Sequence, residues 1–304
     1  MDARRGFRFG LGPVFAFEQV ACSRRWQWYA SRSVFVGMLL AALVVAASEM
    51  PSVESPGELA KLGGRFYLAV TGTQIALVML AAPAATAGAI CQDRASGMMT
   101  HVLVTDLTDV EVVLGKLAAR LVPVLVQVAA ALPLLALLTL LGGVDPDAML
   151  GAFAVTVGVA VLGCSLAFVF SLWAKRTHEA LLGTYAVLAA WLLAWPYARI
   201  LSGASGVWID VPAWLVDPFS LAFAPYWRPG STSPAHYAAF LAAMLAVSAA
   251  LVVLAVSRLR AVCTRTPAPR SSRPRRDWAS RFDALRRLTG PLRDVNPVLW
   301  RELR

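Results

Sequence analysis

The stretch CQDRASGMMTHVLVTDLTDVEVVLGKLAAR, from Cys91 to Arg120, decides how the chain is organised. Apolar runs long enough to cross a bilayer flank it on both sides, whereas the stretch itself carries acids, bases and a helix-start signal. A spanning helix needs about 20 mostly apolar residues, so this polar interruption is interpreted as a loop between two spans. A long loop with ordered features predicts a contact surface on one side of a membrane protein.

The composition of the whole chain is typical of a polytopic membrane protein. Of the 304 residues, 58% are hydrophobic and 15% are charged, against about a quarter charged in a soluble domain. The net charge is +10, with arginines clustered near both ends, which favours a cytoplasmic membrane face over nucleic-acid binding. The four scattered cysteines and three dispersed histidines predict neither a disulfide framework nor a metal site.

Six apolar runs predict an all-α fold with six transmembrane helices. We expect Pro123 and Pro133 to kink the third helix without breaking it, because neighbouring helices can satisfy the freed carbonyls. The approximate bounds of the six runs are 33–48, 66–90, 117–141, 150–173, 180–200 and 237–256.

The basic residues predict that both termini are cytoplasmic. Arginines precede the first span, Lys175 and Arg176 separate the fourth from the fifth, and a basic tail follows the sixth. The loop after the fifth span holds three tryptophans, which favours short interfacial or re-entrant helices. The predicted parts are a cytoplasmic N-terminus at 1–32, a transmembrane domain at 33–257 with a cytoplasmic loop at 91–116 and an external loop at 202–235, and a cytoplasmic tail at 258–304.

The segment 13–29 predicts an amphipathic helix on the inner membrane surface. A proline suits its first helical position, one side is apolar, and two arginines suit lipid headgroups. The alternative is that the segment forms the first turns of the first span. The residues singled out here are Pro13, Phe17, Glu18, Arg24 and Arg25.

The loop at 91–116 divides into two parts. Residues 97–104 predict a short helix with Met98, Met99, Val102 and Leu103 along one exposed apolar side, which favours a docking surface over an ordinary structured loop. Thr108 and Glu111 then form a capping box.

The capping box predicts that a new helix starts near Asp109. This helix would run through Gly115 and Lys116 into the third span.

The chain carries no motif for catalysis. There is no G-x-x-x-x-G-K-[ST] phosphate loop, since Gly115-Lys116 is followed by Leu117. The predicted spans hold almost no ionisable residue, which disfavours an ion-coupled carrier and an intramembrane hydrolase. We therefore predict no catalytic, cofactor-binding or metal-binding residue.

Three pieces of the loop together resemble the loop after the second span of ABC-2 type transporter permeases. They are Gln92-Asp93-Arg94-x-x-Gly97-Met98, Leu103-Val104-Thr105 and Thr108-x-x-Glu111-Val112-Val113-x-Gly115-Lys116. The surface helix, the six spans and the long last external loop are also similar to that family. The chain departs from the pattern at Gln92, Met98 and Asp106, where an acid, threonine and proline are common.

The resemblance implies a permease subunit of an exporter in the bacterial cytoplasmic (inner) membrane, not an enzyme. It would work with a separate cytoplasmic ABC ATPase and a second permease copy or half, with 97–104 as the coupling helix. A polytopic scaffold or assembly factor without transport is the alternative, and no substrate is indicated. The implied docking residues are Asp93, Arg94, Gly97, Met98, Met99, Val102, Leu103, Thr108, Glu111, Gly115 and Lys116.

The C-terminal segment repeats a pattern from the N-terminal one. Pro297, Val298 and Glu302 keep the offsets of Pro13, Val14 and Glu18. Two interpretations remain open: the tail begins a second six-span half, or it forms a docking helix. The stretch 267–276, rich in Pro, Ser and Arg, predicts a disordered linker in either case.

Overall fold

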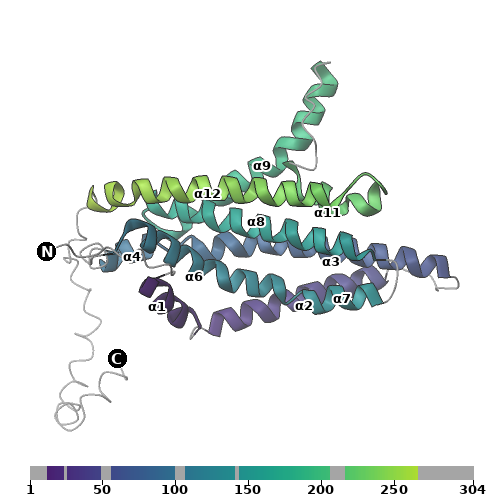
Figure 1. Ribbon diagram of the computed structural model, residues 1–304, viewed down its shortest axis with the longest axis horizontal. Coiled ribbons are helices and arrows are strands. Elements are labelled where there is room, and N and C mark those ends of the chain that lie inside the picture. The colour runs from purple at the N-terminus through teal and green to yellow at the C-terminus, as the bar shows by residue number, and fades with distance from the viewer. Residues whose placement is uncertain are drawn as a thin grey trace, which may run out of the picture. The chain divides into compact units, whose positions relative to one another are not determined.

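The computed structural model describes residues 12–23, 26–48, 56–99, 107–140, 144–205 and 216–265. The predicted linker and the C-terminal repeat lie outside these ranges. The described part is helical and contains no strand. Its helices, labelled in Figure 1, are α1 (Gly12–Ser23), α2 (Trp26–Ser48), α3 (Pro56–Thr86), α4 (Cys91–Ala95), α6 (Asp109–Ala129), α7 (Leu132–Leu140), α8 (Pro146–Trp173), α9 (Thr177–Ser205), α11 (Pro218–Trp227) and α12 (Pro234–Arg265).

Six stretches are long and apolar enough to cross a membrane, which confirms the predicted all-α fold with six spans. The chain is therefore a multi-pass membrane protein. The six stretches are Trp26–Ser48, Leu62–Ala95, Asp109–Leu137, Pro146–Trp173, Thr177–Ile200 and Pro234–Cys263.

Several helices extend beyond the predicted apolar runs. The first spanning helix begins at Trp26, before the predicted run 33–48. The last continues to Arg265, beyond the predicted run 237–256. The fourth begins at Pro146 because the Asp145 side chain accepts a hydrogen bond from the Asp147 N–H at 3.1 Å, an N-cap that apolar periodicity does not reveal.

The two prolines of the third span behave differently. Pro123 lies inside α6, as predicted. At Pro133 the prediction of a kink was wrong, because the helix is interrupted at residues 130–131 and resumes as α7. Pro133 occupies the first turn of α7, where a missing N–H costs least.

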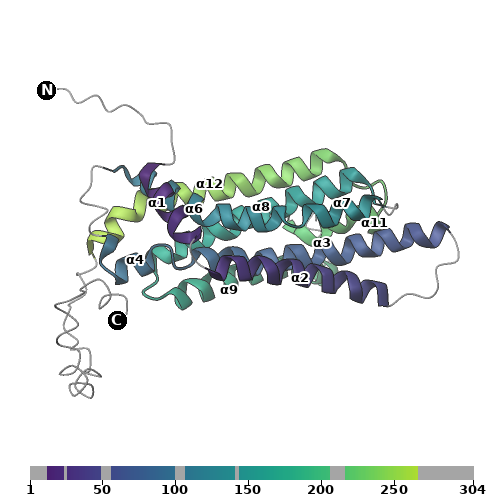
Figure 2. The same ribbon diagram turned by 90° about the horizontal axis from the view of Figure 1, so that it is seen from below.

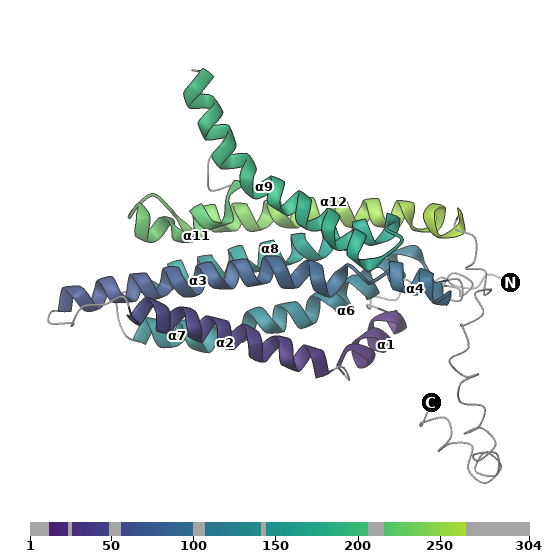
Figure 3. The ribbon, with the colours of Figure 1, turned by 180° about the vertical axis from the view of Figure 1, so that it is seen from behind.

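Helix α8 forms the centre of the bundle. It packs against α3, α6, α9, α11 and α12, and Figures 1 and 2 both show these neighbours around it. Most of its side chains are buried, including Phe168 and Leu172. By contrast α2 contacts α3, α1 and α6 and leaves most of its surface exposed. The second half of α9 diverges from the bundle, with Tyr197 and Ile200 exposed (Figure 3).

A cluster of tyrosines joins the helices at the end of the bundle opposite α4. The Tyr67 hydroxyl lies 3.0 Å from the Ala148 carbonyl of α8 and 2.9 Å from the Ala222 carbonyl of α11. The Tyr226 ring lies 4.7 Å from the Tyr67 ring, and its hydroxyl accepts from the Asp145 N–H at 3.3 Å. The short helix α11 confirms that the loop after the fifth span contains helical structure.

Candidate docking site

Three helices meet around the buried ammonium group of Lys116. This residue of α6 is 5% exposed, and its Nζ lies 2.7 Å from Oε1 of Glu18 on α1. It also pairs with Asp93 of α4. Arg120, one turn further along α6, contacts the other oxygen of Glu18 at 3.4 Å. The cluster thus holds two acids and two bases, and its charges balance.

Hydrogen bonds also join helix α4 to the end of α8. The hydroxyl of Ser171 accepts hydrogen bonds from the Ile90 N–H at 3.0 Å and from the Cys91 N–H at 3.1 Å. The guanidinium of Arg94 donates to the carbonyl of Leu172. Because Asp93 reaches α6 while its neighbour Arg94 reaches α8, the short helix bridges two central helices.

A further ion pair lies at the same end of the bundle. Arg260 of α12 contacts Asp109, the first residue of α6, with Nε 2.7 Å from Oδ1. Unlike Lys116, Arg260 is 62% exposed, so solvent screens this pair. The end therefore gathers α1, α4, the start of α6 and the last turns of α8 and α12, and we call it the charged end.

The predicted capping box is confirmed. The Thr108 hydroxyl accepts from the Glu111 N–H at 3.3 Å, and Glu111 accepts from the Thr108 N–H at 2.9 Å. The two side chains satisfy backbone donors that the helix leaves open at its start. The cap fixes where α6 begins, and Gly115 and Lys116 are buried about two turns later. Lys116 faces α1 and α4 through Glu18 and Asp93.

Gly97 does not begin a helix, which corrects the prediction for 97–104. It follows α4 with φ of 75°, and its N–H donates to the Arg94 carbonyl at 3.2 Å. A left-handed glycine just past the last turn is a common way to end a helix. Met98 and Met99 are helical again, whereas residues 100–106, including the predicted Val102 and Leu103, lie outside the described ranges.

The two methionines face different surroundings. Met98 is 45% exposed, as a docking residue requires. Met99 is 2% exposed and packs in the main core cluster with Val113 and Leu172, so its placement on an exposed apolar face was wrong. The physical reason is that consecutive residues of a helical turn point about 100° apart, and the core takes one of them.

Helix α1 is separate from the first span, which favours the first of the two interpretations for 13–29. It is shorter than predicted, because Trp26, Trp28 and Tyr29 belong to α2. Glu18 and Cys22 turn toward the protein, whereas Phe17 is 63% exposed. The side chain of Pro13 and residues Arg24 and Arg25 lie outside the described part.

Sequence reasoning missed Arg120, Ser171 and Arg260 as parts of the charged end. Arg120 stands four residues after Lys116 and so on the same side of α6, a spacing that could have revealed it. Ser171 and Arg260 lie in segments that composition alone assigns to spans or tail. Among the described residues, no group of three or more His, Cys, Asp or Glu side chains could hold a metal ion.

Comparisons with known proteins identify no relative of this chain. No protein-family model matches the chain, and no curated protein matches it.

Proposed function

We propose that the chain is the membrane-spanning permease subunit of an ABC exporter in the bacterial cytoplasmic membrane, energised by a separate cytoplasmic ATPase. The resemblance of residues 92–116 to ABC-2 type permeases supports this, together with six spans. In the proposal, hydrolysis takes place on the partner and this chain contributes no catalytic residue. A second copy or half completes the transport path.

The observation that carries the proposal is the joining of α1, α4 and α6 around Lys116. A partner that pushed on the loop after α4 would move α6 through Asp93 and α8 through Arg94. Both helices are spans, so the displacement would reach the membrane interior without passing through a flexible loop. Coupling of this kind needs a physically connected path between the two sites, and the charge-balanced ion pairs around Lys116 join the three helices in such a path.

Met98 offers a contact for the partner beside this cluster. It is the exposed apolar residue that follows the turn at Gly97. An exposed apolar side chain beside the ion-pair cluster around Lys116 suits a helix-in-groove contact.

The test is affinity purification of the tagged full-length chain from its source cells in mild detergent, with bound proteins identified by mass spectrometry. We expect an ATPase carrying a phosphate loop to be retained by the wild type and by Met98→Leu. Met98→Asp should lower the retained amount by about tenfold or more, since an unpaired charge in a contact costs about 2 kcal/mol. Retention of no ATPase by the wild type would contradict the proposal and favour the scaffold interpretation.

A further inference from the structure

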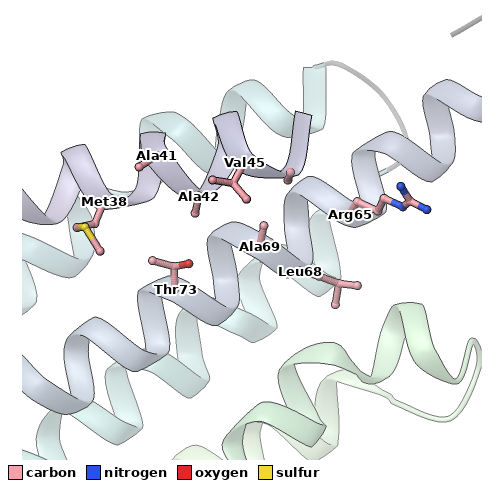
Figure 4. A pocket seen from close by; sticks show the side chains of 9 residues that line it. Met38, Ala41, Ala42, Val45, Arg65, Leu68, Ala69 and Thr73 are labelled. Carbon is pink, nitrogen blue, oxygen red and sulfur yellow. The ribbon is translucent and has the colours of Figure 1, made fainter. Parts of the chain in front are cut away.

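A groove runs between α2 and α3 near the end of the bundle opposite the charged end. Its volume is about 630 Å³, within the range of small-molecule sites. Figure 4 shows that α2 contributes one wall and α3 the other. The lining residues are Met38, Ala41, Ala42, Val45, Ala46, Arg65, Leu68, Ala69 and Thr73.

The groove is apolar along its length and cationic at one end. The small alanine side chains on both helices leave the groove open, and Met38 and Val45, which also line it, are 48% and 58% exposed. Arg65 lies at one end (Figure 4), in the first turn of the span Leu62–Ala95. None of the ion pairs among the described residues involves Arg65.

The position of Arg65 suits the membrane–water boundary. A cation one turn inside a span can reach the headgroup layer with its long side chain. From Arg65 to Thr73 the helix rises about 12 Å, so the apolar part of the groove extends from that boundary into one leaflet. A ligand that fits both parts carries an anionic head and a flexible apolar tail.

We propose that this groove binds an anionic lipid, with one acyl chain between α2 and α3 and the headgroup on Arg65. Lipid surrounds any exposed span at high concentration, so mass action favours its occupancy even at modest affinity. Arg65 is the one cationic residue among those that line the groove, so it gives this site a preference for an anionic headgroup. The inference rests on the six spans and not on the proposed ATPase.

The experiment measures lipid selectivity of the full-length chain. The protein is purified in detergent containing equal amounts of phosphatidylglycerol and phosphatidylcholine, and the retained lipids are counted by native mass spectrometry. We expect at least one phosphatidylglycerol per chain in preference to phosphatidylcholine. Arg65→Gln should lower that preference by about fivefold, the effect of one basic residue at an anionic surface.

A second variant tests the apolar part of the groove. Ala42→Phe fills it and should lower retention of both lipids, and Ala69→Leu should act in the same direction from the facing helix. The matched controls are Arg228→Gln, an exposed arginine outside the groove, and Ala186→Phe on the exposed side of α9, which should both match the wild type.

Two results would overturn the inference. Unchanged phosphatidylglycerol preference in Arg65→Gln would mean that only unselective surrounding lipid is bound. Loss of a protein dimer from the spectrum of Ala42→Phe, with lipid retention unchanged, would assign the groove to a contact between two copies of the chain.

Discussion

Lys116 shows how the charged end holds together at the scale of single residues. Its ammonium group is buried where α1, α4 and α6 meet. Removing an ammonium group from water costs several kcal/mol unless good pairing offsets it. The arrangement therefore depends on both carboxylates, and each of them fixes a different helix.

We predict that Lys116→Met lowers the free energy of unfolding by about 3 kcal/mol, because it leaves the carboxylates of Glu18 and Asp93 facing each other without the cation between them. Thermal unfolding in detergent, followed by tryptophan fluorescence, measures the loss. Arg260→Met is the matched control, since its exposed pair with Asp109 is worth at most about 1 kcal/mol. Equal losses in the two variants would contradict a structural role for the buried cluster.

What the sequence reveals at this scale depends on distance along the chain. The Thr108–Glu111 cap was predictable because its partners are three residues apart. The pairing of Lys116 with Glu18 joins residues 98 positions apart, and no local pattern specifies it. Met98 and Met99 have the same chemistry, so only packing decides which is buried.

At the scale of elements, α8 and α12 pack tightly where Gly151 faces Tyr237. A Cβ built on Gly151 would lie 2.5 Å from the ring of Tyr237. The glycine therefore lets a buried aromatic ring pack directly on the α8 backbone. This contact lies one turn into both helices and sets how they approach each other at that end.

We predict that Gly151→Ala destabilises the fold by about 1–3 kcal/mol through overpacking. Gly37→Ala is the control, because a Cβ there meets nothing within 4 Å and the substitution should be neutral or slightly stabilising. Thermal unfolding of both variants in the same detergent compares them. A Gly151→Ala protein as stable as Gly37→Ala would mean that the Tyr237 ring is free to move away.

The sequence predicts the number of spanning helices better than their ends. Apolar runs identify each span because every lipid-facing turn must be apolar. The ends are set by caps such as Asp145 and by local glycines such as Gly97, which the run lengths do not contain. The five-residue helix α4 was missed because its residues are polar and its stability comes from α6 and α8.

At the scale of the whole described chain, the loops divide into two groups. The charged end joins α4, the start of α6 and the ends of α8 and α12, whereas the tyrosine cluster joins α3, α8 and α11 at the other end. Successive spans cross a membrane in opposite directions, so their connecting loops alternate between its two sides. The six spans are consistent with this division. The positive-inside rule predicts that the charged end faces the cytoplasm.

We predict that Ser231→Cys, in a background lacking Cys22, Cys91, Cys164 and Cys263, reacts with an impermeant thiol reagent in intact cells. Ser96→Cys, also at an exposed position but at the charged end, should react only after permeabilisation. The reagent reports sidedness directly because both positions are accessible in the structure. The opposite pattern would reverse the orientation and place the proposed docking site outside the cell.

The most direct test of the account is site-specific photocrosslinking in intact cells. A photoreactive benzoylphenylalanine replaces Met98 at the charged end or Ser231 at the opposite end, and adducts are identified by mass spectrometry. The account predicts that an ATPase crosslinks at position 98 and not at 231. An ATPase adduct at 231, or none at 98 although the ATPase co-purifies, would contradict the assignment of the charged end as the docking site.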